Sequence, residues 1–164
     1  MNRMKTLIAA ASLLGTALAA TTASALDEYN VSTGTTLSGA GVALRGSDAV
    51  SLASDGTVRA GDAAFTHEHD GVAYYFASEE TRKRFAEDPA RYLPQYGGFC
   101  AFGVAIGKKL DADPRFADIV DGRLYLFLNA VAFEKYLADK AGTLAAAKRN
   151  WPAMHHLAVE EVNG

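Results

Sequence analysis

The single cysteine of this sequence is its strongest candidate for chemistry. Cys100 follows Gly97 and Gly98 and lies at the start of an apolar run that we expect to form a short buried helix. Glycines allow a ligand to approach the backbone closely, and a thiolate at a helix N-terminus has a lowered pKa. Because the thiolate is both the nucleophile and the metal-binding form, Cys100 is predicted to bind a metal ion or to perform redox chemistry. The alternative is a buried, inert cysteine.

The four histidines form two pairs that could supply further ligands. His67 and His69 alternate on a predicted strand and should point to the same face. His155 and His156 follow Met154 near the C-terminus. Imidazole, thiolate and thioether ligands together suit copper or zinc. The alternative interpretations are a solvated strand face for the first pair and a polar tail for the second.

Motifs of the common catalytic classes are missing from the sequence. It contains no Gly-x-Ser-x-Gly elbow, phosphate-binding loop, dinucleotide-binding glycine motif or His-Glu-x-x-His helix. A Cys-His hydrolase would need a histidine within hydrogen-bonding reach of Cys100. The sequence therefore favours a binding module over an enzyme and leaves the question open.

The N-terminal residues 1–25 have the three parts of a secretory signal peptide. Arg3 and Lys5 precede an uncharged apolar run over residues 7–20, and Ala23-Ser24-Ala25 provides a small-residue cleavage site. That run is shorter than the roughly 20 residues needed to span a bilayer. We expect export, cleavage after Ala25, and a protein that is not embedded in a membrane.

Composition limits the partners and the number of domains. The chain has 164 residues, of which 49% are hydrophobic and 21% charged, as in one ordinary globular domain. Sixteen Lys and Arg against nineteen Asp and Glu give a net charge of −3. An acidic chain lacks the basic surface that neutralises phosphates, so we expect no nucleic-acid partner.

Turn and capping residues predict a small α+β domain with two β-hairpins packed among four or five short helices. Residues 26–41 are expected to form a flexible lead-in, 42–152 the domain and 153–164 a C-terminal tail. The hairpins should turn at Asp70-Gly71 and Asp121-Gly122, and residues 57–60 should form a short strand. No internal repeat is evident in the sequence.

Capping residues locate the predicted helices. Ser78 should cap a helix over residues 79–87, and Asn129 another that extends to about residue 139. Asp88-Pro89 can begin a short helix between them. Thr143 should cap the last helix, which we expect to end before Pro152 because the residue ahead of proline disfavours helical geometry.

Six short segments form a characteristic pattern over about Leu44 to Pro152, nearly the whole predicted domain: Tyr74-Tyr75-Phe76-Ala77-Ser78-Glu79-Glu80, Arg84-Phe85, Asp88-Pro89-Ala90-Arg91-Tyr92, Tyr96-Gly97-Gly98-Phe99-Cys100-Ala101-Phe102-Gly103-Val104, Val120-Asp121-Gly122-Arg123-Leu124-Tyr125-Leu126 and Asn150-Trp151-Pro152. Together they resemble the YHS-domain proteins, and more closely the exported bacterial branch of that family. The resemblance implies a YHS-like fold and, for the exported protein, a periplasmic location. No segment is a catalytic signature by itself.

The resemblance also implies where a site would lie. YHS domains of heavy-metal transporters carry metal-binding cysteines where this chain has Ala77 and Thr81, so that site is not inherited. The exported branch keeps a cysteine in its Tyr-Gly-Gly-aromatic-Cys motif, which implies chalcogen redox or metal chemistry at Cys100. Tyr96, with Gly97 and Gly98, completes that motif here.

A second matching position is Asp48. The exported branch tends to have Tyr-Asp-Pro-Val-Ala-Tyr where this chain reads Ser47-Asp48-Ala49-Val50-Ser51-Leu52. The aspartate and the valine are retained and both tyrosines are lost. Asp48 therefore joins Tyr96, Gly97 and Gly98 as a candidate binding residue.

Three functions follow from these observations. The first is an exported module that binds copper or zinc through Cys100, with His67, His69, His155 or His156 as further ligands. The second is a redox protein in which Cys100 reacts with a small thiol, since the chain has no second cysteine to resolve an oxidised form. The third is a non-catalytic interaction domain in which Cys100 is only packed.

Overall fold

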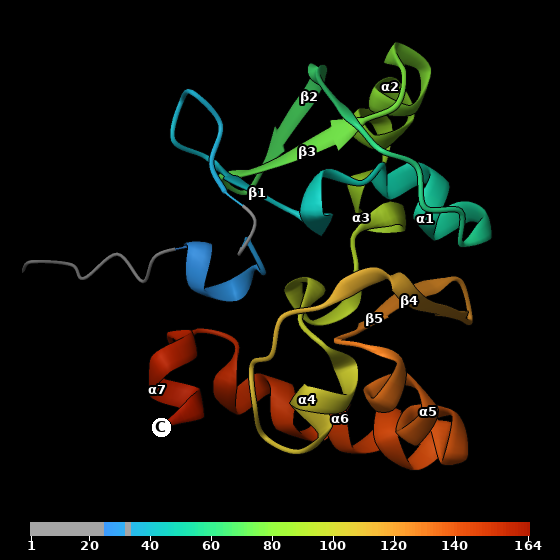
Figure 1. The fold of residues 1–164 in the computed structure, drawn as a ribbon. Coiled ribbons are helices and arrows are strands. Elements are labelled where there is room, and N and C mark those ends of the chain that lie inside the picture. Colours follow the sequence, from blue (N-terminus) through green and yellow to red (C-terminus); the bar gives the residue numbers. More distant parts are fainter. Residues whose placement is uncertain (1–24, 32–33) are drawn as a thin grey trace, which may run out of the picture.

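The computed structural model describes residues 25–31 and 34–164 (Figure 1). The predicted signal peptide, apart from Ala25, lies outside the described residues. Within the described part of the chain, no helix is both long and apolar enough to cross a membrane. The architecture is α+β, as the sequence predicts, with two small sheets and their helices in separate halves.

The first half contains a three-stranded sheet in the order β1-β3-β2. Its strands are β1 (Gly41–Val42), β2 (Asp62–His69) and β3 (Val72–Phe76), and the turn between β2 and β3 is the predicted Asp70-Gly71. Around it lie the short 3-10 helix η2 (Leu44–Gly46) and three helices: α1 (Ala49–Asp55), α2 (Glu79–Glu87) and α3 (Pro89–Tyr92) (Figure 1).

The second half is built on the two-stranded sheet of β4 (Asp113–Val120) and β5 (Arg123–Phe127). Its helices are η3 (Gln95–Gly98), α4 (Ala101–Ala105), α5 (Ala130–Ala138), α6 (Lys140–Met154) and α7 (Val159–Asn163). The 3-10 helix η1 (Ala25–Glu28) lies beside this half, at the N-terminal end of the described chain (Figure 1). The described residues thus form seven α-helices, more than the four or five expected.

The two hairpins and the helices that follow them are copies of one structural unit. β2 and β4 have eight residues, β3 and β5 have five, and α2 and α5 have nine. Asp70 and Asp121, 51 positions apart, both have φ of 51°. Both hairpins also shift register near the start of their first strand. The expectation of no internal repeat was therefore wrong at the level of structure.

Capping explains why both units fold in the same way. Ser78 accepts a hydrogen bond from the backbone N–H of Thr81, and Asn129 accepts one from Ala132. A side-chain oxygen at this position satisfies a free N–H of the first helical turn. Serine and asparagine are about equally good N-cap residues. The two units therefore share the same capping geometry although the capping residues differ.

Two predicted elements differ from the structure. Residues 57–60 form no strand; Ala60 makes only an isolated bridge to Ser47. The last long helix begins at Lys140, because Asp139 rather than Thr143 caps it by accepting a hydrogen bond from Gly142. It continues through Pro152 to Met154. Burial of Met154 in the core favours this continuation despite the backbone bond that proline removes.

Candidate metal centre

Cys100 is at the predicted helix start but is not the accessible thiolate that we expected. It is the N-cap of α4 and is completely buried. Its Sγ accepts a hydrogen bond from the backbone N–H of Gly103 at 3.4 Å. Removal from water raises the pKa of the thiol, and the nearby backbone N–H groups of Gly103, Leu128 and Phe102 lower it by less. The prediction of a reachable, low-pKa sulfur was wrong.

Asp48 is the N-cap of α1, as Cys100 is the N-cap of α4, so its contacts help to explain the role of Cys100. The Asp48 carboxylate accepts hydrogen bonds from the backbone N–H groups of Val50 (2.8 Å) and Ser51 (3.0 Å) at the start of α1, and from Ala77 (2.8 Å) just after β3. Cys100 has the corresponding place in the second unit: its Sγ accepts a hydrogen bond from Gly103 in α4, and the backbone N–H of Leu128, just after β5, is near enough to lower the pKa of the thiol. Both side chains fasten a helix start to the end of a hairpin. Both therefore have a structural role here, and a binding role for Asp48 stays a prediction.

The burial of Cys100 gives a test by alkylation. We expect iodoacetamide at pH 8 to modify native Cys100 roughly 100-fold more slowly than the unfolded chain, because reaction requires the structure to open. Burial raises the pKa of the thiol in the folded protein, so the protonated thiol stabilises the folded state. This stabilisation is complete below the unfolded pKa of about 8.5 and is lost as the pH rises through the folded pKa. Equal alkylation rates of native and unfolded protein would contradict the burial.

Gly97 and Gly98 do permit a close approach, but the approaching group is another part of the same chain. A Cβ atom on Gly97 would lie 1.7 Å from the carbonyl oxygen of Glu28. The backbone N–H of Asn30 donates to the Gly97 carbonyl at 2.9 Å, and the Asn30 side chain donates to the Gly98 carbonyl at 3.2 Å. Residues 26–31, expected to belong to a flexible lead-in, are bound to the domain here.

His67 and His69 lie on one face of β2, as predicted, but the face is partly covered. Both rings pack edge-on against Phe85, with ring centroids 5.6 and 6.1 Å away. Burial lowers the pKa of His67, so the imidazole is neutral at neutral pH. Within the described chain, neither histidine belongs to a group of three potential metal ligands. This pair therefore packs against Phe85, and among the described residues the structure brings no third potential ligand to it.

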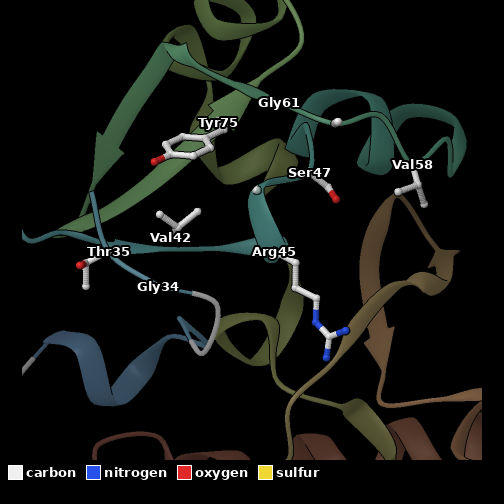
Figure 2. Close-up of a pocket in the computed structure, with 10 residues that line it drawn as sticks. Gly34, Thr35, Val42, Arg45, Ser47, Val58, Gly61 and Tyr75 are labelled. Carbon is white, nitrogen blue, oxygen red and sulfur yellow. The ribbon is translucent and has the colours of Figure 1, made fainter. Parts of the chain in front are cut away.

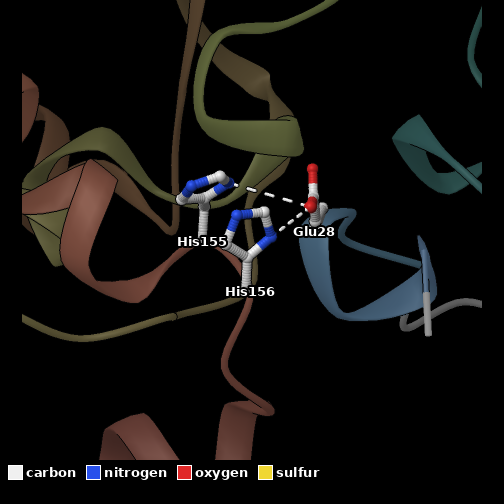
Figure 3. Close-up of side chains that lie close together, drawn as sticks. All are labelled: Glu28, His155 and His156. Carbon is white, nitrogen blue, oxygen red and sulfur yellow. Dashed lines mark ion pairs between the residues drawn. The ribbon is translucent and has the colours of Figure 1, made fainter. Parts of the chain in front are cut away.

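The C-terminal histidines instead meet a carboxylate from the other end of the described chain. His156 Nδ1 lies 2.5 Å from Glu28 Oε1, and His155 Nδ1 lies 3.8 Å from the same oxygen. Figure 3 shows both imidazole rings turned towards Glu28. The three residues offer ligand atoms that all lie within 4.8 Å of one another. Cys100 belongs to no such group among the described residues.

Lys109 holds the two ends of this cluster together. Its side chain is 1% exposed, and Nζ donates to the carbonyl oxygens of Asp27 (2.6 Å), His155 (2.9 Å) and Leu157 (2.6 Å). One ammonium group thus binds the segment that carries Glu28 and the turn that carries both histidines. Burial lowers the pKa of Lys109 from its ordinary value.

The expected C-terminal tail, residues 153–164, is part of the folded domain. It contains α7, whose Asn163 side chain accepts a hydrogen bond from the backbone N–H of Lys109 and donates one to its carbonyl oxygen. The Lys108 ammonium donates to the Asn163 carbonyl at 2.6 Å. Met154 is 6% exposed and packs in the core, so its sulfur is not placed to bind a metal with the neighbouring histidines.

Two imidazoles and one carboxylate form a set of ligands that suits zinc. Three protein ligands with an open fourth position are typical of zinc sites that bind water or substrate. The His156 side chain is 59% exposed, so this cluster is open to solvent on one side. The sequence pointed to His155 and His156 but not to Glu28, because nothing in a local pattern links residues so far apart in the chain.

A separate cavity of about 470 Å³ lies between η2, β1 and Tyr75 of β3 (Figure 2). Arg45 is the one charged residue among those that line it. Figure 2 shows Arg45 extending away from Tyr75, and its guanidinium pairs with Asp111 at 2.6 Å and Asp113 at 3.3 Å. Because this cation is already bound by two carboxylates, the cavity gives little support for a ligand site.

Comparisons of the chain with protein-family models, curated proteins and solved structures gave no match. The resemblance to the YHS-domain family therefore stays a prediction. The candidate function therefore follows from the close approach of Glu28, His155 and His156.

Proposed function

We propose that this protein is a metal-binding domain that holds a divalent ion, zinc or copper(II), through Glu28, His155 and His156. The observation that supports this proposal is the convergence of three ligand atoms within 4.8 Å. One carboxylate and two imidazoles can bind a divalent ion together, and these residue types recur in zinc and copper sites. The proposal keeps the predicted histidine pair and replaces Cys100 with Glu28.

The chemistry of the ligands favours a borderline ion over a soft one. Copper(I) prefers thiolate and thioether sulfur, but Cys100 and Met154 are both buried in the core. Nitrogen and oxygen ligands suit zinc and copper(II). A redox function for Cys100 gains no support from a buried thiol whose pKa is raised.

Export is part of the same proposal. The signal-peptide pattern over residues 1–25 supports export, and the resemblance to the exported YHS branch supports the periplasm as the compartment. There, a site formed by residues from both ends of the mature chain would take up zinc or copper(II). The proposed role is to bind the ion.

Calorimetric titration with Zn²⁺ tests this function. We expect the mature chain to bind one zinc ion, and His156→Ala to weaken binding at least roughly tenfold, or 1.4 kcal/mol, because one ligand is lost. Glu28→Gln should weaken it similarly, since an amide is a poorer zinc ligand than a carboxylate. Circular dichroism of each variant would verify that the fold is retained.

The matched control is His69→Gln, which removes one histidine of the predicted strand pair and leaves the cluster intact. Its zinc affinity should equal that of the wild type. If His69→Gln weakens binding as much as His156→Ala does, zinc binds elsewhere. The proposal is also wrong if wild-type protein shows no binding at millimolar zinc.

A further inference from the structure

A second cavity, of about 510 Å³, lies between η3, the turn of the β4–β5 hairpin and α6. Tyr96, Tyr125 and Trp151 contribute aromatic side chains to its lining. The Tyr96 ring lies 5.9 Å from that of Tyr125 and 5.6 Å from that of Trp151, measured between centroids. Size and aromatic lining are both typical of a small-molecule site.

Cationic groups at the rim of this cavity are available to a ligand. Arg123 and Lys148 line the cavity and are both exposed. Neither forms an ion pair with any residue in the described part of the chain. Two such cations favour a ligand that carries an anionic group, and a carboxylate can accept hydrogen bonds from either.

The corresponding place in the first structural unit, at the turn of the β2–β3 hairpin, holds a tyrosine side chain. Asp70, which corresponds to Asp121, accepts a hydrogen bond from the Tyr29 hydroxyl at 2.8 Å. Tyr29 also lies near enough to Tyr74, the counterpart of Tyr125, to affect its pKa electrostatically. A phenol from outside the unit thus binds the aspartate at the first hairpin turn. At the second turn, Asp121 lines an open cavity instead.

We infer that this cavity binds a small phenolic carboxylic acid. Its ring would pack against Tyr96, Tyr125 and Trp151, its hydroxyl would donate to Asp121, and its carboxylate would meet both Arg123 and Lys148. The inference is independent of the metal centre, because none of these residues is a proposed metal ligand.

Tyr96 is suited to such a ligand. Its backbone has φ of 56°, a left-handed conformation that is uncommon outside glycine and is often found at functional sites. Burial, followed by the influence of Tyr125, raises the pKa of Tyr96 to about 12. Its hydroxyl therefore stays protonated at neutral pH and can donate a hydrogen bond to a bound acid.

The sequence provides a convenient probe, because Trp151 is its only tryptophan. Titration of ¹⁵N-labelled protein with 4-hydroxybenzoate, in the presence of EDTA, should shift the single indole N–H resonance. Benzoate lacks the hydroxyl and 4-hydroxybenzyl alcohol lacks the carboxylate. Each should bind about tenfold more weakly, the loss expected for one charge-assisted hydrogen bond.

Two variants and a control complete the test. Asp121→Gly keeps the left-handed backbone available and should abolish the preference for 4-hydroxybenzoate over benzoate. Lys148→Gln should weaken both acids and leave the alcohol unchanged, whereas Lys83→Gln on α2 should change nothing. An unmoved indole resonance at millimolar 4-hydroxybenzoate, equal binding of the three probes, or an unchanged preference in Asp121→Gly would overturn the inference.

Discussion

The Lys109→Met variant is expected to lose about 4 kcal/mol of unfolding free energy, because three partly buried carbonyl groups lose a charged donor. These carbonyls belong to Asp27, His155 and Leu157, and each lies within 2.9 Å of the Lys109 ammonium. Methionine fills a similar volume but donates no hydrogen bond, so the three partly buried acceptors lose this partner. The same nitrogen also lies 5.3 Å from the ring centre of Phe99, a contact that methionine would replace without its charge.

Chemical denaturation and thermal unfolding both measure this effect. The expected change corresponds to a fall in Tm of about 10 °C for a domain of this size. Lys108→Met is the matched control, since the neighbouring Lys108 ammonium bonds to a single carbonyl, that of Asn163. It should lose about 1 kcal/mol. Equal losses in the two variants would show that Lys109 does not join the two ends of the chain.

Zinc should stabilise the folded protein strongly. At a free zinc concentration about 1,000 times the Kd, binding only to the folded state adds about 4 kcal/mol. Glu28 and the two histidines lie near opposite ends of the described chain, so unfolding separates them and removes the site. We therefore expect Tm to rise by about 10 °C with zinc.

The double variant Glu28→Gln/His156→Ala provides the comparison. With two of the three ligands replaced, its Tm should not change when zinc is added. Differential scanning calorimetry with zinc and with EDTA would record both proteins. A zinc-induced rise of the same size in the double variant would show that the stabilising ion binds at another place.

Much of the fold could be predicted because its signals are local. Asp70-Gly71 and Asp121-Gly122 specify tight turns between short strands, and both hairpins are present. Ser78 and Asn129 cap the helices expected of them. Each of these features depends on a few adjacent residues, so one sequence suffices to find them.

The duplicated unit could not be found in this way. Asp48 and Cys100 both cap the helix that follows them by accepting backbone N–H groups, but one is a carboxylate and the other a thiol. The repeat preserves the backbone geometry and the capping of the helix start, and both a carboxylate and a thiol can provide that cap. A comparison of residue types along the chain therefore misses the relation that the structure shows.

The candidate site was predictable only in part, for a related reason. His155 and His156 have the right chemistry, but their partner Glu28 belongs to a segment that looked like a loose lead-in. That segment is bound by Gly97 and Lys109, which lie far from it in the sequence. The burial of Cys100 likewise depends on packing between distant elements, whereas its glycine neighbours suggested access.

X-ray absorption at the zinc edge of the zinc-loaded protein tests the proposed metal centre most directly. A site formed by Glu28, His155 and His156 requires nitrogen and oxygen neighbours at about 2.0–2.1 Å, with the outer-shell scattering of two imidazoles. A sulfur neighbour at about 2.3 Å would instead identify Cys100 as a ligand. That result would contradict the proposed ligands and would require the core around α4 to open.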